Sequence, residues 1–392
     1  MASKNNNCRN DVTNVSDWMQ YINKFPEPKS DLERMRFQFL TQRKYGKIDK
    51  FFLNSILAIF AFIPAFLIMC VKSIHVKRYK ADAILFCTKS RMSHILENDL
   101  PQDLQKEFPN RVLKLKNDNA VKRMIDGVLD FATIKNILKV IIRYPFSFYM
   151  NFYYLMHVAY ICKLKKCYSP KAIISIQTEL DFSTSMLTNY CESNSIEYIG
   201  VAHGEYILNL ERAFVRFTRY YAWNNEMIEL FYLTRSPHNG FFVYQTNRLA
   251  PIYKKQPNPE FFISYYLDDQ SIEEIEKLKV ILVEFTKKGY MCKIRVHPRA
   301  GDLQETKRIF EGTSIYVENP RDVPLSDSIE NSRYIVSTFS TVLREAYASG
   351  FDVVIDDMND IITIEAMKEV KYSLLDKTDL RLSDLYNNLV KN

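Results

Sequence analysis

"KAIISIQTELDFSTSMLTNYCESNSIEYIGVAH", Lys171 to His203, holds two short apolar runs separated by a polar stretch. The first run, "KAIISI", and the second, "IEYIGVAH", have the length and the β-branched content of strands. The stretch between them begins with Asp181 and Ser183, residue types that cap the N-termini of helices. A strand, a helix and a second strand in this order predict a βαβ unit and therefore a parallel sheet.

The same alternation continues on both sides of this unit. Before it, "DAILFCT" (82–88) predicts a strand, and 134–166 predicts a helical region that is broken near Pro145. After it, "YYAW" (220–223) predicts a further short strand, followed by a helix. These elements together predict one α/β domain.

A second alternating series follows "TNRLAPIYKKQPNPE" (246–260), whose three prolines indicate a linker. Its main predicted strands lie at 261–267, 290–296 and 333–338, and a helix is expected at 340–350. We therefore expect an α/β protein with two Rossmann-like domains facing a central cleft. The expected divisions are a helical extension (1–80), an N-terminal Rossmann-like domain (81–250) and a C-terminal Rossmann-like domain (251–392).

Composition limits the classes of partner. The chain of 392 residues is 47% hydrophobic and 25% charged and has only 9 Gly and 14 Pro, which is typical of globular domains. Its net charge of +7 is spread along the chain, which argues against nucleic-acid binding but suits an anionic partner such as a nucleotide-activated substrate or a phospholipid surface. The seven cysteines form no C-x-x-C pair, so neither a zinc site nor a disulfide framework is predicted, and a reducing cytosol fits best.

One segment is unusual for a soluble chain. "FFLNSILAIFAFIPAFLIMCV", residues 51–71, has no charged residue and is about as long as a membrane-crossing helix. Lysine and arginine are equally frequent on its two sides, so charge does not orient it across a bilayer. A helix or a hairpin bent at Pro64 that dips into an anionic leaflet is predicted, and a fully buried core helix is the alternative.

Polar residues follow two of the predicted strands, at the strand ends where ligands bind in parallel α/β sheets. His203, Gly204 and Glu205 end one strand, and an imidazole beside a carboxylate suits general-base catalysis on a hydroxyl group. In the second domain His297 ends the strand "YMCKIRV", because Pro298 cannot continue the ladder. His297 and the following Arg299 are expected to contact a phosphate.

A third strand end is rich in hydroxyl groups. In "STFSTVLREAYASG" four hydroxyl residues surround the start of a helix, where free backbone N–H groups favour phosphate. They are Ser337, Thr338, Ser340 and Thr341. Glu345, one turn into that helix, is expected to reach ribose hydroxyls.

The motifs "HGEY", "RVHPR" and "STFST…EAYASG" resemble those of GT-B glycosyltransferases of bacterial surface polysaccharides. They are most similar to the bacterial sialyltransferases and to the Kdo or capsule transferases, which use CMP-activated sugars. The resemblance covers roughly residues 170–357, and it implies that 81–250 is the acceptor domain and 251–392 the nucleotide-sugar donor domain. It implies that His297, Pro298 and the hydroxyl residues bind the donor's phosphate, and that an acidic residue of the N-terminal half is the catalytic base.

The acidic-acidic-Gly motif that carries the base in the sialyltransferases has no clean copy here. Asp126-Gly127 is a partial match, while Glu179, Asp181 and Glu205 are further candidates for the base. The CDP-glycerol polyol-phosphate transferases also use His-Gly and His-Pro-Arg, so a polyol-phosphate transferase is the alternative. A non-catalytic component of polysaccharide assembly is a second alternative.

The expected protein is a metal-independent glycosyltransferase without a cofactor, at the cytoplasmic face of the inner membrane and peripheral or monotopic. Its expected partners are a nucleotide-activated sugar of CMP type, an acceptor oligosaccharide or glycolipid, and the membrane surface. Acidic residues also follow a strand in "DDMND" (356–360), which we expect to be a solvated turn rather than a metal site.

Overall fold

The computed structural model of the chain describes residues 15–45, 51–72, 77–87, 100–115, 126–176, 178–204, 206–246, 253–268, 270–298, 301–358 and 364–391. These residues form two compact units, Ser16–Thr246 and Asn247–Asn392, which are called here the N-terminal and the C-terminal unit. The division falls within the proline-containing stretch 246–260.

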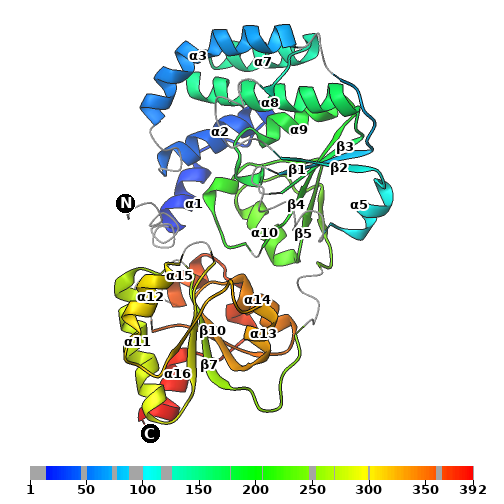
Figure 1. Cartoon of the computed structure of the whole chain (residues 1–392). Helices are drawn as coiled ribbons and strands as arrows, with labels where there is room; N and C mark the ends of the chain where they lie inside the picture. The colour runs from blue at the N-terminus through cyan, green and yellow to red at the C-terminus, as the bar shows by residue number, and fades with distance from the viewer. Residues whose placement is uncertain are drawn as a thin grey trace. The chain divides into compact units, whose positions relative to one another are not determined.

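A six-stranded parallel sheet is the centre of the N-terminal unit (Figure 1). Its spatial order is β2-β1-β3-β4-β5-β6, and its strands are β1 (Ala83–Cys87), β2 (Arg111–Leu115), β3 (Ala172–Ile176), β4 (Glu197–Val201), β5 (Arg219–Ala222) and β6 (Phe241–Val243). β3 pairs in parallel with β4, with Ala172 opposite Glu197 and Ile176 opposite Val201. The predicted βαβ unit is therefore confirmed, whereas β2 and β6 were not predicted.

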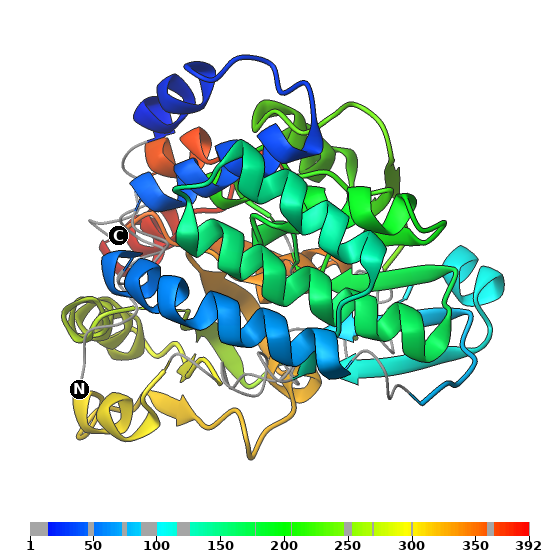
Figure 2. The same ribbon diagram turned by 90° about the horizontal axis from the view of Figure 1, so that it is seen from above.

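Helices cover this sheet in layers. They are α1 (Val15–Asn23), α2 (Asp31–Lys44), α3 (Phe51–Lys72), α5 (Gln102–Glu107), α7 (Phe131–Arg143), α8 (Phe148–Tyr168), α9 (Thr184–Glu192) and α10 (Asn225–Leu233). α8 is buried over most of its length because α3, α7 and α9 all pack against it. Figure 2 looks down onto α3 and its neighbouring helices. The predicted break near Pro145 is confirmed, since it separates α7 from α8.

α3 is the expected membrane segment. It is one continuous helix that passes through Pro64, so the expected hairpin is not formed. It is long and apolar enough to cross a membrane, judged by length and composition alone. Only 11% of its most apolar stretch is buried, which contradicts the alternative of a fully buried core helix.

The C-terminal unit is built around a second parallel sheet, of five strands. Its order is β11-β10-β7-β8-β9, and its strands are β7 (Phe261–Tyr266), β8 (Cys292–Arg295), β9 (Tyr316–Glu318), β10 (Ser332–Ser337) and β11 (Asp352–Ile355). Its helices include α11 (Ile272–Lys287), α12 (Leu303–Ile309), α13 (Leu325–Glu330), α14 (Thr341–Ala348), α15 (Ile364–Glu369) and α16 (Leu382–Tyr386). The predicted fold class, two Rossmann-like α/β domains with additional N-terminal helices, is confirmed.

Capping and alternation explain these elements locally. Ser271 and Glu274 form a capping box that starts α11, since each side chain binds the other residue's backbone N–H. Cys292 and Ile294 on β8, and Val296 directly after it, join the apolar core of the C-terminal unit. The alternating residues Lys293 and Arg295 are also buried, although both are basic. One side of β8 is therefore apolar and the other is charged.

Candidate active site

At the carboxyl end of β3 and β4 the N-terminal unit gathers a polar cluster. Glu179, in the turn after β3, is buried, and its Oε1 accepts a hydrogen bond of 2.6 Å from the Tyr206 hydroxyl. The same hydroxyl lies 3.3 Å from His203 Nδ1 and 2.7 Å from the Tyr220 hydroxyl. His203 Nδ1 is itself 3.7 Å from Glu179 Oε1. Tyr206 thus connects the histidine that ends β4 to the carboxylate that follows β3.

The surroundings of Glu179 shift its pKa. Burial raises the pKa of its carboxyl group, and the Arg212 guanidinium and the Tyr206 hydrogen bond oppose that effect. Arg212 stacks over the Tyr206 ring at 3.8 Å, and its Nε is 3.9 Å from Glu179 Oε1. A carboxyl group with a raised pKa beside an imidazole is a common feature of catalytic sites. Glu179 was one of the sequence candidates for the base, and the structure brings it together with His203.

Asp181 lies in a different set of contacts. Its Oδ1 accepts hydrogen bonds from the backbone N–H (2.9 Å) and the hydroxyl (2.7 Å) of Ser183, just before α9. Its Oδ2 is 2.7 Å from Nδ1 of the buried His157. Ser183 Oγ contacts the same His157 nitrogen at 2.9 Å. In a Ser-His-Asp triad the serine and the aspartate contact opposite ring nitrogens, so these three residues do not have triad geometry.

Two sequence candidates lie outside the described residues, namely Glu205 and Arg299. The partial motif Asp126-Gly127 lies in the helical layer and not at a strand end. A Cβ atom at Gly127 would lie 2.7 Å from Ala159 Cβ on α8 and 3.2 Å from Met69 Cε on α3, so glycine allows the chain at this position to pass close to both helices.

His297 follows β8 at the carboxyl edge of the second sheet, as predicted, and is partly buried. The backbone N–H of Gly301 donates to the His297 carbonyl at 3.1 Å, which closes a tight loop. A Cβ atom at Gly301 would lie 2.3 Å from Val296 Cγ1 and 3.1 Å from His297 N, so only glycine fits there without rearrangement. Pro298, in this loop, is exposed.

The hydroxyl residues after β10 have different surroundings. Ser337 is buried, and its hydroxyl donates to the Tyr266 carbonyl at 2.7 Å, which ties β10 to β7. Thr338 Oγ1 accepts a 3.1 Å hydrogen bond from Gln270 Nε2. Ser340 is the N-cap of α14 and accepts from the Val342 N–H at 3.3 Å. Thr341, the first residue of α14, is partly exposed.

Strand order brings His297 and these hydroxyl residues to the same edge of one sheet. β8 and β10 flank β7, so the ends of β8 and β10 are two inter-strand spacings apart, roughly 10 Å. His297, Thr338 and the start of α14 therefore lie at neighbouring carboxyl ends, where ligands bind in open α/β sheets.

Glu345 is buried, and its Oε2 accepts a 2.9 Å hydrogen bond from the Tyr253 hydroxyl. This contact connects α14 to the start of the C-terminal unit. Contact of Glu345 with ribose stays a prediction.

The expectation of a solvated turn at 356–360 is wrong for Asp356, and residues 359 and 360 lie outside the described residues. Asp356 is buried, its Oδ2 accepts a 2.6 Å hydrogen bond from the Tyr265 hydroxyl, and burial raises its pKa. Asp357 accepts hydrogen bonds from Ser383, at 2.9 Å from the backbone N–H and 2.6 Å from the hydroxyl. Both carboxylates therefore fasten the start of this turn to the C-terminal unit.

Sequence reasoning missed an ion cluster beneath this site. Lys293 Nζ donates to Glu318 Oε2 at 2.8 Å and to the Ser328 carbonyl at 2.9 Å, and Arg295 donates to Glu318 Oε1. Glu318 on β9 lies directly opposite Arg295 on β8. All three charged side chains are buried. The signal was present in the sequence, as two basic residues at alternate positions of an otherwise apolar strand.

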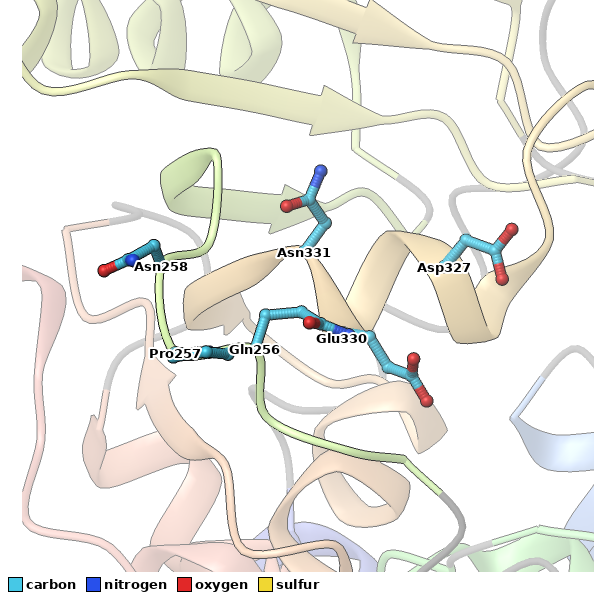
Figure 3. Close-up of a pocket in the computed structure, with 6 residues that line it drawn as sticks. All are labelled: Gln256, Pro257, Asn258, Asp327, Glu330 and Asn331. Carbon is cyan, nitrogen blue, oxygen red and sulfur yellow. The ribbon is translucent and has the colours of Figure 1, made fainter.

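A polar groove of about 470 Å³ lies at the opposite edge of the second sheet (Figure 3). It is lined by Gln256, Pro257, Asn258, Asp327, Glu330 and Asn331. Asn331 precedes β10 and Asn258 precedes β7, so the groove is at the amino ends of the strands. It therefore lies away from His297 and Thr338.

The chain therefore consists of two Rossmann-like units, and each unit has a polar cluster at the carboxyl ends of its strands. No protein-family model matches the chain, and no curated protein matches it. Solved structures do match, and the glycosyltransferase of kitacinnamycin is similar over 80% of this chain and 90% of its own, with 11% identity and a TM-score of 0.45.

Two other solved structures have comparable values. Staphylococcus aureus MnaA, solved with UDP, is 11% identical over 79% of this chain and 91% of its own, with a TM-score of 0.44. Acinetobacter baumannii MurG is 10% identical over 79% and 90%, with a TM-score of 0.43.

Proposed function

We propose that the chain is a glycosyltransferase that moves a sugar from a nucleotide-activated donor to a hydroxyl group of a glycan or glycolipid. The observation that carries this proposal is the pairing of His297 with the Thr338–Thr341 turn across β7, at the carboxyl edge of the second sheet. The N-terminal unit supplies a second cluster, in which an imidazole is supported by Tyr206 and Glu179.

In this proposal His203 is the catalytic base. Its Nδ1 faces the Tyr206 hydroxyl, which donates to Glu179, so the tautomer with a proton on Nδ1 satisfies both contacts. Nε2 then takes the proton of the acceptor hydroxyl as the acceptor oxygen bonds to the anomeric carbon. Glu179 is buried and acts through Tyr206 as a positioning residue.

The C-terminal unit stabilises the leaving group. As the bond between the anomeric carbon and the donor's phosphate oxygen breaks, negative charge grows on the nucleotide. In this proposal His297 and the N–H groups at the start of α14 bind that charge. Thr338 and Thr341 add hydroxyl groups at the same edge, and Arg299, outside the described residues, is proposed as a further contact.

The motifs favour a CMP-activated sugar of the sialic acid or Kdo type. A CDP-activated polyol is the alternative, and UDP is the nucleotide in the solved MnaA structure. A non-catalytic role in polysaccharide assembly would keep nucleotide binding without turnover.

A thermal-shift screen with CMP, CDP, UDP and GDP tests the donor site. The matching nucleotide is expected to raise the melting temperature, because a ligand at one hundred times its Kd stabilises the folded state by about 2.7 kcal/mol. His297→Ala should abolish the shift. Asn258→Ala, in the groove at the other edge of the sheet, should keep it. A shift that survives in His297→Ala, or that is absent with all four nucleotides, would contradict the proposed site.

Turnover is expected to be unchanged by EDTA. The acidic residues that follow β11, Asp356 and Asp357, are already hydrogen-bonded to Tyr265 and Ser383. In this proposal the charge of the donor's phosphate is neutralised by His297 and the backbone N–H groups at the start of α14. Loss of activity in EDTA that Mg²⁺ or Mn²⁺ restores would show that a metal ion takes part.

A further inference from the structure

The outer side of α3 is apolar from end to end. Its exposed residues are Phe52, Leu53, Ile56, Leu57, Ile59, Phe60, Ile63, Pro64, Leu67, Ile68, Val71 and Lys72. Only the last of these, at the C-terminus of the helix, is charged or polar. Phe60 is 75% exposed and Ile63 67%, values far outside those of core side chains. Contiguous apolar surface of this extent marks an interaction site.

The inner side of α3 holds the helix against the unit along its whole length. Ala58, Ala65 and Met69 form a buried stripe at i, i+7 and i+11. At the C-terminal end the Leu129 N–H donates to the Met69 carbonyl at 3.2 Å. At the N-terminal end the Phe51 ring packs 6.1 Å from that of Tyr149 on α8. α3 therefore lies along α8 and is not a free segment.

α7 and the turn after it extend the apolar surface. Phe131 is 82% exposed, Ile142 78% and Phe146 87%, and Leu138 lies between the first two on the same side of the helix. α3 and α7 both pack against α8, and Figures 1 and 2 show them on the same outer side of the unit. We call these exposed residues of α3, α7 and the turn the α3–α7 face.

Charge on this face has one sign. The segments 51–72 and 131–168 contain no aspartate or glutamate. Exposed Lys135, Lys139 and Arg143 lie among the apolar residues of α7, and Lys72 ends α3. Apolar side chains beside basic ones suit a surface of acyl chains and anionic headgroups.

We propose that the α3–α7 face binds the surface of an anionic bilayer, with α3 lying in the plane of the interface. A spanning α3 would have to leave α8, which would expose the stripe of Ala58, Ala65 and Met69 and break the Leu129 hydrogen bond. A protein partner is less suited, since protein interfaces carry about one hydrogen bond per 100–200 Å² and the exposed side of α3 offers almost no donor or acceptor. This inference does not depend on the proposed glycosyltransferase activity.

Vesicle flotation of the full chain tests the proposal. The chain should float with vesicles of phosphatidylcholine containing phosphatidylglycerol, and more weakly with phosphatidylcholine alone. The double variant Phe60→Glu/Ile63→Glu should weaken binding at least about tenfold, because two charges enter the apolar layer. Lys135→Gln/Lys139→Gln should lose roughly fivefold for each basic residue removed, on the anionic vesicles only.

Val280→Glu is the matched control, since Val280 is an apolar residue of α11 that is 64% exposed in the C-terminal unit. It should float like the unchanged chain, and circular dichroism should show that every variant is folded. Failure of the unchanged chain to float would overturn the proposal. The proposal would also be overturned if the unchanged chain self-associates and Phe60→Glu/Ile63→Glu converts it to monomers without changing its flotation.

Depth measurements distinguish a helix in the interface plane from a spanning one. Tryptophan placed singly at Phe52, Phe60 or Leu67 is quenched by lipids brominated at shallow or deep acyl positions. An in-plane helix predicts the same shallow profile at all three positions. A deep profile at Phe60 with shallow profiles at Phe52 and Leu67 would show a spanning helix and overturn the in-plane orientation.

Discussion

Replacement of His203 by alanine is expected to lower kcat by roughly 10²–10⁴-fold, the range contributed by a general base. The nucleotide-induced thermal shift should persist in this variant, because the proposed donor contacts come from the C-terminal unit. Turnover of a nucleotide-sugar and the thermal shift, measured on the same preparation, separate the two effects.

His238→Ala is the control for this experiment. His238 is an exposed histidine of the same unit, and it stacks on Tyr232 with ring centroids 4.1 Å apart. Its removal should leave turnover unchanged. If His203→Ala also retains full turnover, the base is another residue, and Glu205 is then the first candidate to replace.

Replacement of Glu318 by alanine is expected to destabilise the C-terminal unit by about 3–5 kcal/mol, because it leaves the buried Lys293 and Arg295 without their counter-ion. Both tryptophans, Trp18 and Trp223, lie in the N-terminal unit. In urea, the unfolding transition seen by circular dichroism should therefore shift to lower concentration, while the tryptophan-fluorescence transition stays in place.

Asp352→Ala provides the matched control. It removes the carboxylate of an ion pair with Lys255 in the same unit, at 3.4 Å, in which both side chains are about half exposed. Such pairs contribute about 0–1 kcal/mol. Equal effects of Glu318→Ala and Asp352→Ala would show that the buried cluster does not hold the unit together.

The same cluster of Lys293, Arg295 and Glu318 makes the stability of the C-terminal unit depend on pH. Burial by itself would raise the pKa of Glu318, but the hydrogen bonds from Lys293 and Ser328 outweigh it and hold the pKa below the ordinary value of 4.5. A carboxyl group with a lowered pKa stabilises the folded state above its unfolded pKa. The contribution of Glu318 to the free energy of unfolding should be complete above its unfolded pKa and should be lost as the pH falls through the lowered pKa. The Glu318→Ala variant should not show this loss of stability.

The strands were predictable where the sequence is apolar and uninterrupted. "KAIISI" and "FFISYYL" are buried on both faces, and the structure contains β3 and β7 within a residue or two of their predicted bounds. β2 was missed because "RVLKL" carries two basic residues in five, and β6 because it is only three residues long.

The candidate site was predictable only in part, for a geometric reason. Strand order determines that His297 and Thr338 lie on either side of β7, and alternation of strands and helices does not determine strand order. Tyr206 connects His203 to Glu179, which lies 24 positions earlier in the chain. No sequence motif predicts this contact. Roles that depend on burial, as for Asp356 and Glu345, likewise became visible only with the fold.

The position of α3 in the chain has a consequence for synthesis. α3 ends at residue 72, whereas α8, the helix that covers its inner side, begins at residue 148. At about 5–20 residues per second, several seconds pass between the appearance of the two helices at the ribosome. During that interval the 22-residue apolar helix lacks α8, the helix against which its inner side packs. A nascent chain that reaches a lipid surface in this interval would shelter α3 there, so docking and folding of the N-terminal unit would take place together.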